Sequence, residues 1–215
     1  MPRLNPHTTE TIRMSIEDGA LKLFVRAGYA GTSMRDIALA VGLSPGALYN
    51  HYPNKQALFR AVVARYREQF STDDNPVRNL LTRSRFPFDI PKLAAAIRTL
   101  IATHRSYWLL WYVDVIEFDG VHFQSELAPH AVLGIPELKT RLDQIKHEDI
   151  LTIDPNLAFV MVYMHLFNYY LIENLFRGKD HYGVDETTAV TSIADVFLRG
   201  MLKPGVEADQ QGDSQ

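Results

Sequence analysis

The most constraining stretch of this chain is residues 32–58, TSMRDIALAVGLSPGALYNHYPNKQAL. Its first apolar residues have the i, i+3, i+4, i+7 spacing of one helical face: Met34, Ile37, Ala38 and Val41. Thr32 or Ser33 can cap this helix, and Gly42 ends it. Ser44 and Pro45 favour a second short helix, because serine is a good N-cap residue and proline suits the first helical position. The spacing predicts a helix-turn-helix.

A third helix is expected directly behind this pair, with Asn54 as its cap and Lys55 in its first turn. Helix-turn-helix folds place their second helix in the major groove of DNA. Leu48 and Tyr52 are spaced i, i+4 and are expected to face inward. The residues expected to point away from the core, at least in part, are Gly46, Ala47, Tyr49, Asn50 and His51.

A family resemblance rests on these residues. Residues 9–70, about a third of the chain, resemble the DNA-binding domain of TetR/AcrR-type transcriptional regulators. The positions that agree in register are Gly28, Tyr29, Thr32, Ser33, Asp36, Ile37, Ala38, Gly42, Gly46, Leu48, Tyr49, His51, Tyr52 and Lys55. The DNA-binding residues that we predict from pattern and resemblance together are Thr32, Ser33, Arg35, Ser44, Gly46, Ala47, Tyr49, Asn50, His51 and Lys55.

Five of these residues are expected to contact phosphate. The resemblance implies that Tyr49 and His51 donate to phosphate oxygens. Lys55 and the N–H groups at the start of its helix form a second anion site, because a helix N-terminus carries partial positive charge. Thr32 and Ser33 can hold a phosphate in the same way. Such contacts orient a protein on DNA without reading its sequence.

Few residues are candidates for reading bases. Arg35 can make a bidentate contact with guanine, Asn50 can pair with adenine, and Ala47 can touch a thymine methyl group. The plainer interpretation of Arg35 is a solvated helix residue. Because Pro45 and Gly46 offer little to hydrogen-bond with, we expect DNA shape to supply part of the specificity.

The charge of the chain is unevenly distributed. Residues 1–70 hold nine Lys/Arg and five Asp/Glu, whereas the remaining residues hold thirteen basic and twenty acidic ones. A net charge of −3 therefore hides a basic N-terminal part and an acidic remainder. This division is typical of a polyanion-binding domain joined to a domain that does not bind polyanions.

The composition excludes several other kinds of site and several other classes of protein. The chain has no cysteine, which excludes disulfides and thiolate metal sites and agrees with a cytoplasmic location. The N-terminal residues lack the apolar core of a signal peptide. The longest apolar run, residues 157–172, contains His165 and Asn168 and is too short to span a bilayer comfortably, so no membrane association is expected.

The sequence predicts an all-α fold with an N-terminal three-helix head that carries the helix-turn-helix and a larger helical body for effector binding and dimerisation. Residues 1–8 are predicted to be a flexible arm, 9–70 the DNA-binding domain with its connecting helix, 76–203 the body and 204–215 a disordered tail. Helices of the body are expected at 90–104, 106–118, 155–176 and 185–202.

The last two helices predict a homodimer. The 155–176 helix is apolar nearly all round, so it must be covered on more than one side. A two-fold four-helix interface, similar to the one that the family uses, would cover it and would pair two DNA-reading heads. The predicted interface residues are Phe159, Tyr163, Phe167, Tyr170, Ile193, Phe197 and Met201. The alternative is the core of a monomeric bundle.

The body is also expected to hold an effector, as the resemblance implies. Trp108 and Trp111 are three residues apart, and Tyr107 and Trp111 four apart, so these rings share one side of a helix. The candidate lining residues are Tyr107, Trp108, Trp111, Tyr112, Phe123, Met161, Met164, His165 and Asn168. Aromatic and methionine stripes at helical spacing are more often plain core.

The sequence favours a regulator over an enzyme. It shows no i, i+4 histidine pair, glycine-rich phosphate loop or nucleophile elbow, so no metal, cofactor or catalytic residue is expected. We predict a homodimer that binds a double-stranded, pseudo-palindromic operator and represses transcription until a small apolar or aromatic effector binds. The alternatives are an enzyme with a helical body and a nonspecific DNA-organising protein.

Overall fold

The computed structural model describes residues 6–70, 75–81, 83, 85–124 and 136–206 of the 215-residue chain. Within these residues it contains ten helices, no strand and one isolated bridge between Leu151 and Leu202, which confirms the all-α prediction. The contacts divide the chain into two compact units. Unit 1 comprises residues 1–72 and 104–127, and unit 2 comprises residues 73–103 and 128–215.

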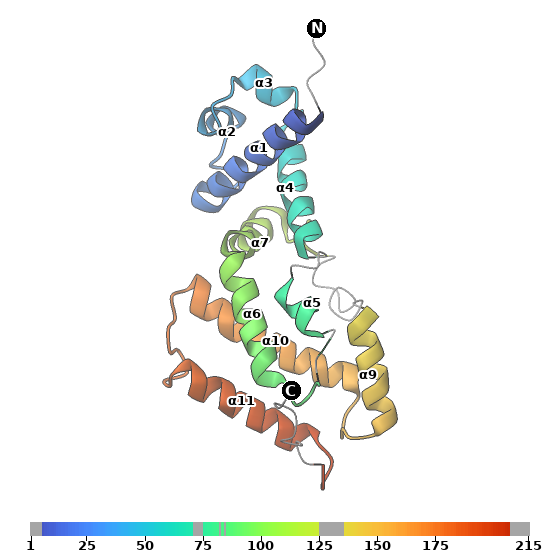
Figure 1. Ribbon diagram of the computed structural model, residues 1–215. Helices are drawn as coiled ribbons and strands as arrows, with labels where there is room; N and C mark the ends of the chain where they lie inside the picture. The colour runs from blue at the N-terminus through green and yellow to red at the C-terminus, as the bar shows by residue number, and fades with distance from the viewer. Residues whose placement is uncertain (1–5, 71–74, 82, 84, 125–135, 207–215) are drawn as a thin grey trace. The chain divides into compact units, whose positions relative to one another are not determined.

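Unit 1 contains the N-terminal helices and one helix from later in the chain. Its elements are α1 (Pro6–Ala27), α2 (Met34–Ala40), α3 (Pro45–Tyr49), α4 (Lys55–Phe70) and α7 (Arg105–Phe118). Helix α1 contacts α2, α4 and α7, and α2 contacts α3 (Figure 1). The predicted DNA-binding domain at 9–70 therefore packs together with α7 in one unit, although α7 lies far away in the sequence.

The helix-turn-helix forms at the predicted residues because polar side chains cap each short helix. Ser33 caps α2 in a capping box with Asp36. Ser44 caps α3 by accepting the N–H of Ala47, and Pro45 occupies the first helical position. The carboxamide oxygen of Asn54 accepts the N–H of Ala57 at 2.8 Å at the start of α4. These observations confirm the predicted helix starts.

The core of unit 1 is built from buried residues of all five of its helices, α1, α2, α3, α4 and α7. Leu48 and Tyr52 are both buried, as their spacing predicts. The ring of Phe59 packs at 5.4 Å from that of Phe24, between centroids. Glu17 is buried on α1, accepts a hydrogen bond from the Tyr52 hydroxyl and forms an ion pair with Arg65 at 3.2 Å. This buried carboxylate ties α1 to α4 and to the end of the helix-turn-helix.

Unit 2 is built around one long apolar helix. Its elements are α5 (Pro76–Leu81), α6 (Ile90–Thr103), α9 (Pro136–Glu148), α10 (Pro155–Leu175) and α11 (Glu186–Met201). Helix α10 contacts α6, α9 and α11, and α5 contacts α6. Because α10 is covered by three neighbours, its apolar residues extend over most of its circumference. The bridge at Leu151 and Leu202 joins the residues before α10 to the end of α11.

The helix boundaries agree with the expected ranges to within one or two residues for α4, α6, α7, α10 and α11. The short helix α5 and the bridge were not predicted, because neither leaves a periodic pattern long enough to recognise. Helix α9 was not among the expected helices either, although its buried residues Leu138, Leu142 and Ile145 share one face at i, i+4, i+7 spacing. Helix α1 begins at Pro6, inside the expected arm, so only residues 1–5 of the arm lie outside the described part. Residues 207–215 of the expected tail also lie outside it.

The close approach of α1 and α2 gives a test of the packing in unit 1. A Cβ atom at Gly19 would lie 2.4 Å from Cγ1 of Val41, so we expect Gly19→Ala to force the two helices apart and lower the free energy of unfolding by about 1 to 3 kcal/mol. Gly200→Ala is the matched control, because nothing lies within 4 Å of that position and alanine favours a helix. Urea unfolding followed by circular dichroism measures both. An unchanged Gly19→Ala midpoint would contradict the packing.

Candidate nucleic-acid interface

The helix-turn-helix presents most of the predicted DNA-binding residues at its surface. Tyr49 is 52% exposed, and Asn50 beside it is exposed as well. Arg35 on α2 is also exposed. The structure therefore brings these residues to the surface of one small motif, while Leu48 anchors α3 from inside. Four more of the predicted DNA-binding residues are exposed or half-buried on this motif, namely Ser44, Gly46, Ala47 and His51.

Thr32 and Ser33 already have partners within the fold. Thr32 is buried, and its hydroxyl donates to the carbonyl oxygen of Gly28 at 2.8 Å. The Ser33 hydroxyl accepts the N–H of Asp36 at 3.1 Å, and the Ser33 N–H donates to the Asp36 carboxylate at 3.0 Å. Hydrogen bonds from the Ser33 side chain and backbone lower the pKa of Asp36. Both hydroxyls thus stabilise the start of α2.

Lys55 lies under the turn between α1 and α2. Its ammonium group donates to the carbonyl oxygens of Tyr29 at 2.6 Å and Thr32 at 2.8 Å. It also lies 4.1 Å from the centroid of the Tyr29 ring, a favourable cation–π position. An ammonium group has three N–H donors, so one remains for an external anion. Lys55 therefore supports the turn as well as being positioned near the surface.

Glu117 of α7 binds the same turn by accepting hydrogen bonds from its backbone N–H groups. One carboxylate oxygen accepts the N–H of Tyr29 and the other accepts the N–H of Ala30, each at 2.6 Å. Gly28 has φ of 76°, and a Cβ there would lie 2.8 Å from the Glu117 carboxylate, so glycine is needed for this approach. Burial, and secondly the charge of Glu117, raises the pKa of Tyr29. We define this arrangement of Glu117, Lys55 and the residue 28–32 turn as the turn clamp.

The end of α7 that carries Glu117 is fixed by aromatic and buried polar contacts. The ring of Phe118 lies 4.6 Å from Tyr29 and 5.0 Å from Phe59, between centroids. The carboxylate of Asp114 is fully buried and accepts the backbone N–H groups of His122 and Phe123, each at 3.1 Å. It also lies 2.6 Å from Nδ1 of His122. The sequence indicated no such role for Glu117, since an isolated acid 88 residues away from the turn leaves no local pattern.

The predicted effector-binding residues fall into two groups. Tyr107, Trp108, Trp111 and Phe123 of unit 1 form one cluster, with ring centroids between 5.1 and 6.2 Å apart. Tyr112 is 39% exposed. The other group, Met161, Met164, His165 and Asn168, belongs to α10 of unit 2.

Those α10 residues lie largely at the surface. Met161 and Met164 are 46% and 47% exposed, and Asn168 is exposed. His165 is half-buried, with its ring 5.6 Å from that of Phe197 and its Nε2 3.4 Å from the Tyr182 hydroxyl. The face of α10 that was expected to line a pocket is therefore mostly exposed at the surface of unit 2.

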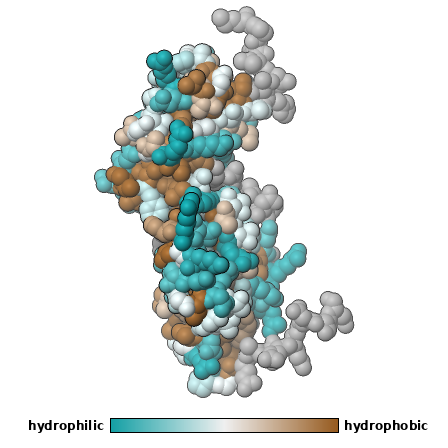
Figure 2. All heavy atoms as spheres, turned by 90° about the vertical axis from the view of Figure 1, so that its left-hand side faces the viewer, coloured by the Kyte–Doolittle hydropathy of each residue, from teal (hydrophilic) through white to brown (hydrophobic). Residues whose placement is uncertain are grey.

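Most of the residues predicted for the dimer interface face the interior of unit 2. Those buried are Phe159, Phe167, Tyr170, Ile193 and Met201, and those half-buried are Tyr163 and Phe197. The large apolar residues exposed on α10 and α11 are Leu157, Met161, Met164 and Val196. Figure 2 shows apolar side chains reaching the surface among polar ones. A partner that covers this unit would meet that second set of residues.

Two further features bear on function. In the part of the chain that the structure describes, no three His, Asp or Glu side chains gather in a way that could hold a metal ion. None of the described helices combines the length and apolar content needed to cross a membrane.

Comparison with known proteins connects this geometry to a family. Residues 16–62 match the family described as bacterial regulatory proteins, tetR family. The HTH-type transcriptional repressor ComR of Escherichia coli (strain K12) is 44% identical over 54 residues, which are 25% of this chain and 26% of that protein. The HTH-type transcriptional regulator AcrR of Shigella flexneri is 37% identical over 62 residues, 29% of each protein. In these matches the chain spans only about a quarter to a third of the relatives' length.

Solved structures share the whole fold. A TetR-family transcriptional regulator structure from Marinobacter aquaeolei VT8 has a TM-score of 0.64 at 14% identity and covers 93% of this chain and all of its own. One from Mesorhizobium loti MAFF303099 has a TM-score of 0.63 at 20% identity, covering 91% of this chain and 98% of its own. A SmeT–triclosan complex has a TM-score of 0.57 at 17% identity, covering 92% and 95%. At such identities the likeness shows the fold: a helix-turn-helix head with a larger helical body.

The turn clamp can be tested directly. Glu117→Ala removes two charge-assisted hydrogen bonds, so we expect the amide protons of Tyr29 and Ala30 to exchange with solvent about tenfold faster or more. Hydrogen–deuterium exchange followed by NMR measures this. Glu10→Ala, which removes an exposed carboxylate on α1, is the control and should leave both amides unchanged. Equal exchange in the wild type and Glu117→Ala would rule out the clamp.

Proposed function

Because the chain belongs to the TetR family of bacterial regulatory proteins through its N-terminal helix-turn-helix, we propose that it regulates transcription by binding a double-stranded operator in sequence-specific fashion. The observation that carries this proposal is the orientation of α3, with Leu48 buried and Tyr49 and Asn50 exposed on the other side. Its place of action would be the cytoplasm, where bacterial DNA lies. The relatives are named as transcriptional regulators and repressors, which supports a regulator rather than an enzyme.

The proposed base-reading residues are exposed on two neighbouring helices. Asn50 at the end of α3 has a side chain suited to adenine, and Arg35 on α2 has one suited to guanine. Ala47 is half-buried on the same motif and can meet a thymine methyl group. Because α3 is only five residues long, few bases can be contacted directly, and DNA shape would contribute to specificity.

The proposed phosphate contacts surround this surface. Tyr49 and His51 would donate to phosphate oxygens on one side of α3. On the other, the N–H groups at the start of α4 and the third N–H of Lys55 would bind a second phosphate. The hydroxyls of Thr32 and Ser33 are engaged within the fold, so we expect them to help mainly by holding α2 in position.

We propose that the protein acts as a homodimer on a pseudo-palindromic operator. Leu157, Met161 and Met164 form an exposed apolar stripe with i, i+4, i+7 spacing on α10. Val196 of α11 is 69% exposed, and Phe197 beside it is half-buried. A two-fold axis that pairs these helices would bury apolar surface and present two heads to two half-sites.

The proposed sign of regulation is repression relieved by a small molecule. The relative ComR is named a repressor, and one solved structure of this fold holds triclosan. An apolar or aromatic effector would contact the cluster of Tyr107, Trp108 and Trp111, which lies on the same helix as Glu117. It must bind the form that cannot engage DNA better than the form that can, or the equilibrium does not shift.

Selection of genomic DNA fragments by the purified protein at near-physiological salt tests the proposal. We expect enrichment of one inverted repeat. Asn50→Ala should relax preference at one base position in each half-site, worth about 1 to 3 kcal/mol of discrimination. Tyr49→Phe, which removes only a hydroxyl, should weaken binding to every sequence alike. Uniform recovery of all fragments would instead indicate a nonspecific DNA-organising protein.

The dimer face can be tested by sedimentation. Met161→Glu places a charge in the exposed stripe of α10, so we expect a shift from dimer to monomer at micromolar concentration. Val115→Glu is the control, because Val115 is 59% exposed on α7 and outside the stripe. A Met161→Glu protein that remains fully dimeric would move the interface to another surface.

A further inference from the structure

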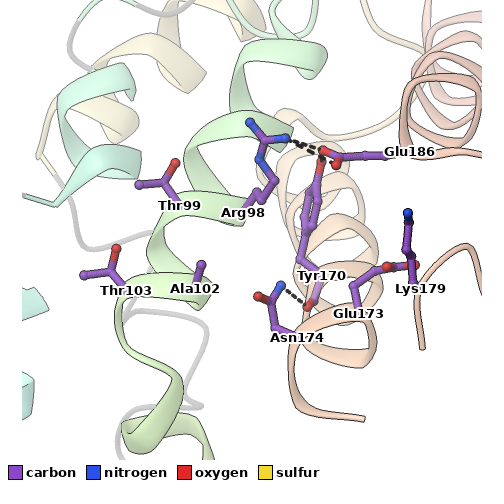
Figure 3. A pocket seen from close by; sticks show the side chains of 9 residues that line it. All are labelled: Arg98, Thr99, Ala102, Thr103, Tyr170, Glu173, Asn174, Lys179 and Glu186. Carbon is purple, nitrogen blue, oxygen red and sulfur yellow. Dashed lines mark hydrogen bonds and ion pairs between the residues drawn. The ribbon is translucent and has the colours of Figure 1, made fainter. Parts of the chain in front are cut away.

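Unit 2 contains a hollow of about 500 Å³ between α6, α10 and the start of α11. Apart from Ala102, every residue that lines it carries a polar or charged group (Figure 3). The volume lies within the range of about 300 to 1,000 Å³ that is usual for small-molecule sites. An apolar ligand is disfavoured here, because it would separate charged side chains from water without replacing their hydrogen bonds.

The two carboxylates at the hollow already have donors. Nη1 of Arg98 lies 3.0 and 3.2 Å from the two oxygens of Glu186, and the Tyr170 hydroxyl donates to the first of them at 2.9 Å (Figure 3). Burial, together with this hydrogen bond, raises the pKa of Tyr170, so the hydroxyl keeps its proton. Glu173 accepts from His181, whose Nδ1 is 2.7 Å away.

The two cations at the hollow retain donors. Among the residues that the structure describes, only Nη1 of Arg98 has a partner, which leaves Nε and Nη2 on the other edge of the guanidinium group. Lys179 is exposed and has no ionic or hydrogen-bond partner within the same residues. The hydrogen-bonding groups left over at the hollow are therefore N–H donors on positively charged side chains. The edge of a guanidinium group can donate two parallel hydrogen bonds to one carboxylate.

We propose that this hollow is a binding site for a small polar carboxylate. The carboxylate group would bind the open edge of Arg98, with Lys179 as a second positive charge, and hydroxyl groups of the ligand would meet Thr99 and Thr103. The site differs in residues and in chemistry from the aromatic cluster of α7. It extends the ligand-binding capacity of the protein from apolar compounds to hydroxy acids.

The position of the site also suggests an effect on the head, and this part rests on the proposed regulatory function. Arg98 lies on α6, which ends at Thr103, and α7 begins two residues later at Arg105. Helix α7 carries Glu117, which holds the turn before the helix-turn-helix. A carboxylate on the open edge of Arg98 would shift the guanidinium group and so alter its ion pair with Glu186, which joins α6 to α11.

Binding is tested on the full chain with four carboxylates, namely lactate, malate, citrate and gluconate, by ligand-observed NMR and thermal unfolding. Sorbitol, which replaces the carboxylate of gluconate by a hydroxymethyl group, is the matched neutral probe. We expect saturable binding of at least one carboxylate and none of sorbitol. No saturable binding of any of the four, or equal binding of gluconate and sorbitol, would overturn the proposal.

Two variants distinguish carboxylate binding by Arg98 from a purely structural role of its ion pair with Glu186. Arg98→Gln should weaken carboxylate binding about tenfold or more, since it removes the charge and the fork. Glu186→Gln breaks the same ion pair but releases Nη1 of Arg98, so carboxylate binding should persist or tighten. Equal loss in both variants would mean that the ion pair only supports the fold. Operator affinity with and without the ligand, measured separately, decides the regulatory part without affecting the binding result.

Discussion

The opposite charges on the two sides of one turn are the constraint on which the head of this protein depends. Glu117 binds the N–H groups of Tyr29 and Ala30, while Lys55 binds the carbonyl oxygens of Tyr29 and Thr32. Backbone groups in a turn need partners, and here a carboxylate serves the donors and an ammonium the acceptors. Because α2 starts directly after this turn, its position depends on charges carried by α4 and α7.

The proposed DNA-contacting surface is made of very short helices, whose stability depends on caps and on packing against the rest of unit 1. A five-residue helix such as α3 is not stable alone, since nucleation costs more than so few hydrogen bonds return. Ser44 caps α3, Leu48 anchors it, and the hydrogen bond from Tyr52 to the buried Glu17 holds the chain just after its C-terminal end. These contacts fix the position of the short helix that carries the exposed side chains, and a site built on a fixed element is more precise than one on a loop.

Outside the helix-turn-helix, three features of the chain underlie the proposed ligand and partner sites. One is the aromatic cluster on α7, in which Tyr107 and Trp108 are buried and the rings are in edge-to-face contact. The second is the charged hollow of unit 2, with Arg98, Tyr170 and Glu186 among its lining residues. The third is the apolar stripe of α10, from Leu157 to Met164. Each of the three carries a separate proposal: an apolar compound, a carboxylate and a second copy of the chain.

The sequence by itself determined the all-α fold, the helix-turn-helix and its caps, because periodicity and capping depend on residues within a few positions of each other. Only the tertiary structure decided which side chains face inward and which charged residues pair, because both depend on residues far apart in the sequence. Helix α10 is apolar nearly all round, so only its packing against α6, α9 and α11 shows that Phe159 and Phe167 face inward while Met161 and Met164 face outward. The pairing of Glu117 with Tyr29, and of Arg98 with Glu186, likewise joins residues 88 positions apart, where no local pattern exists.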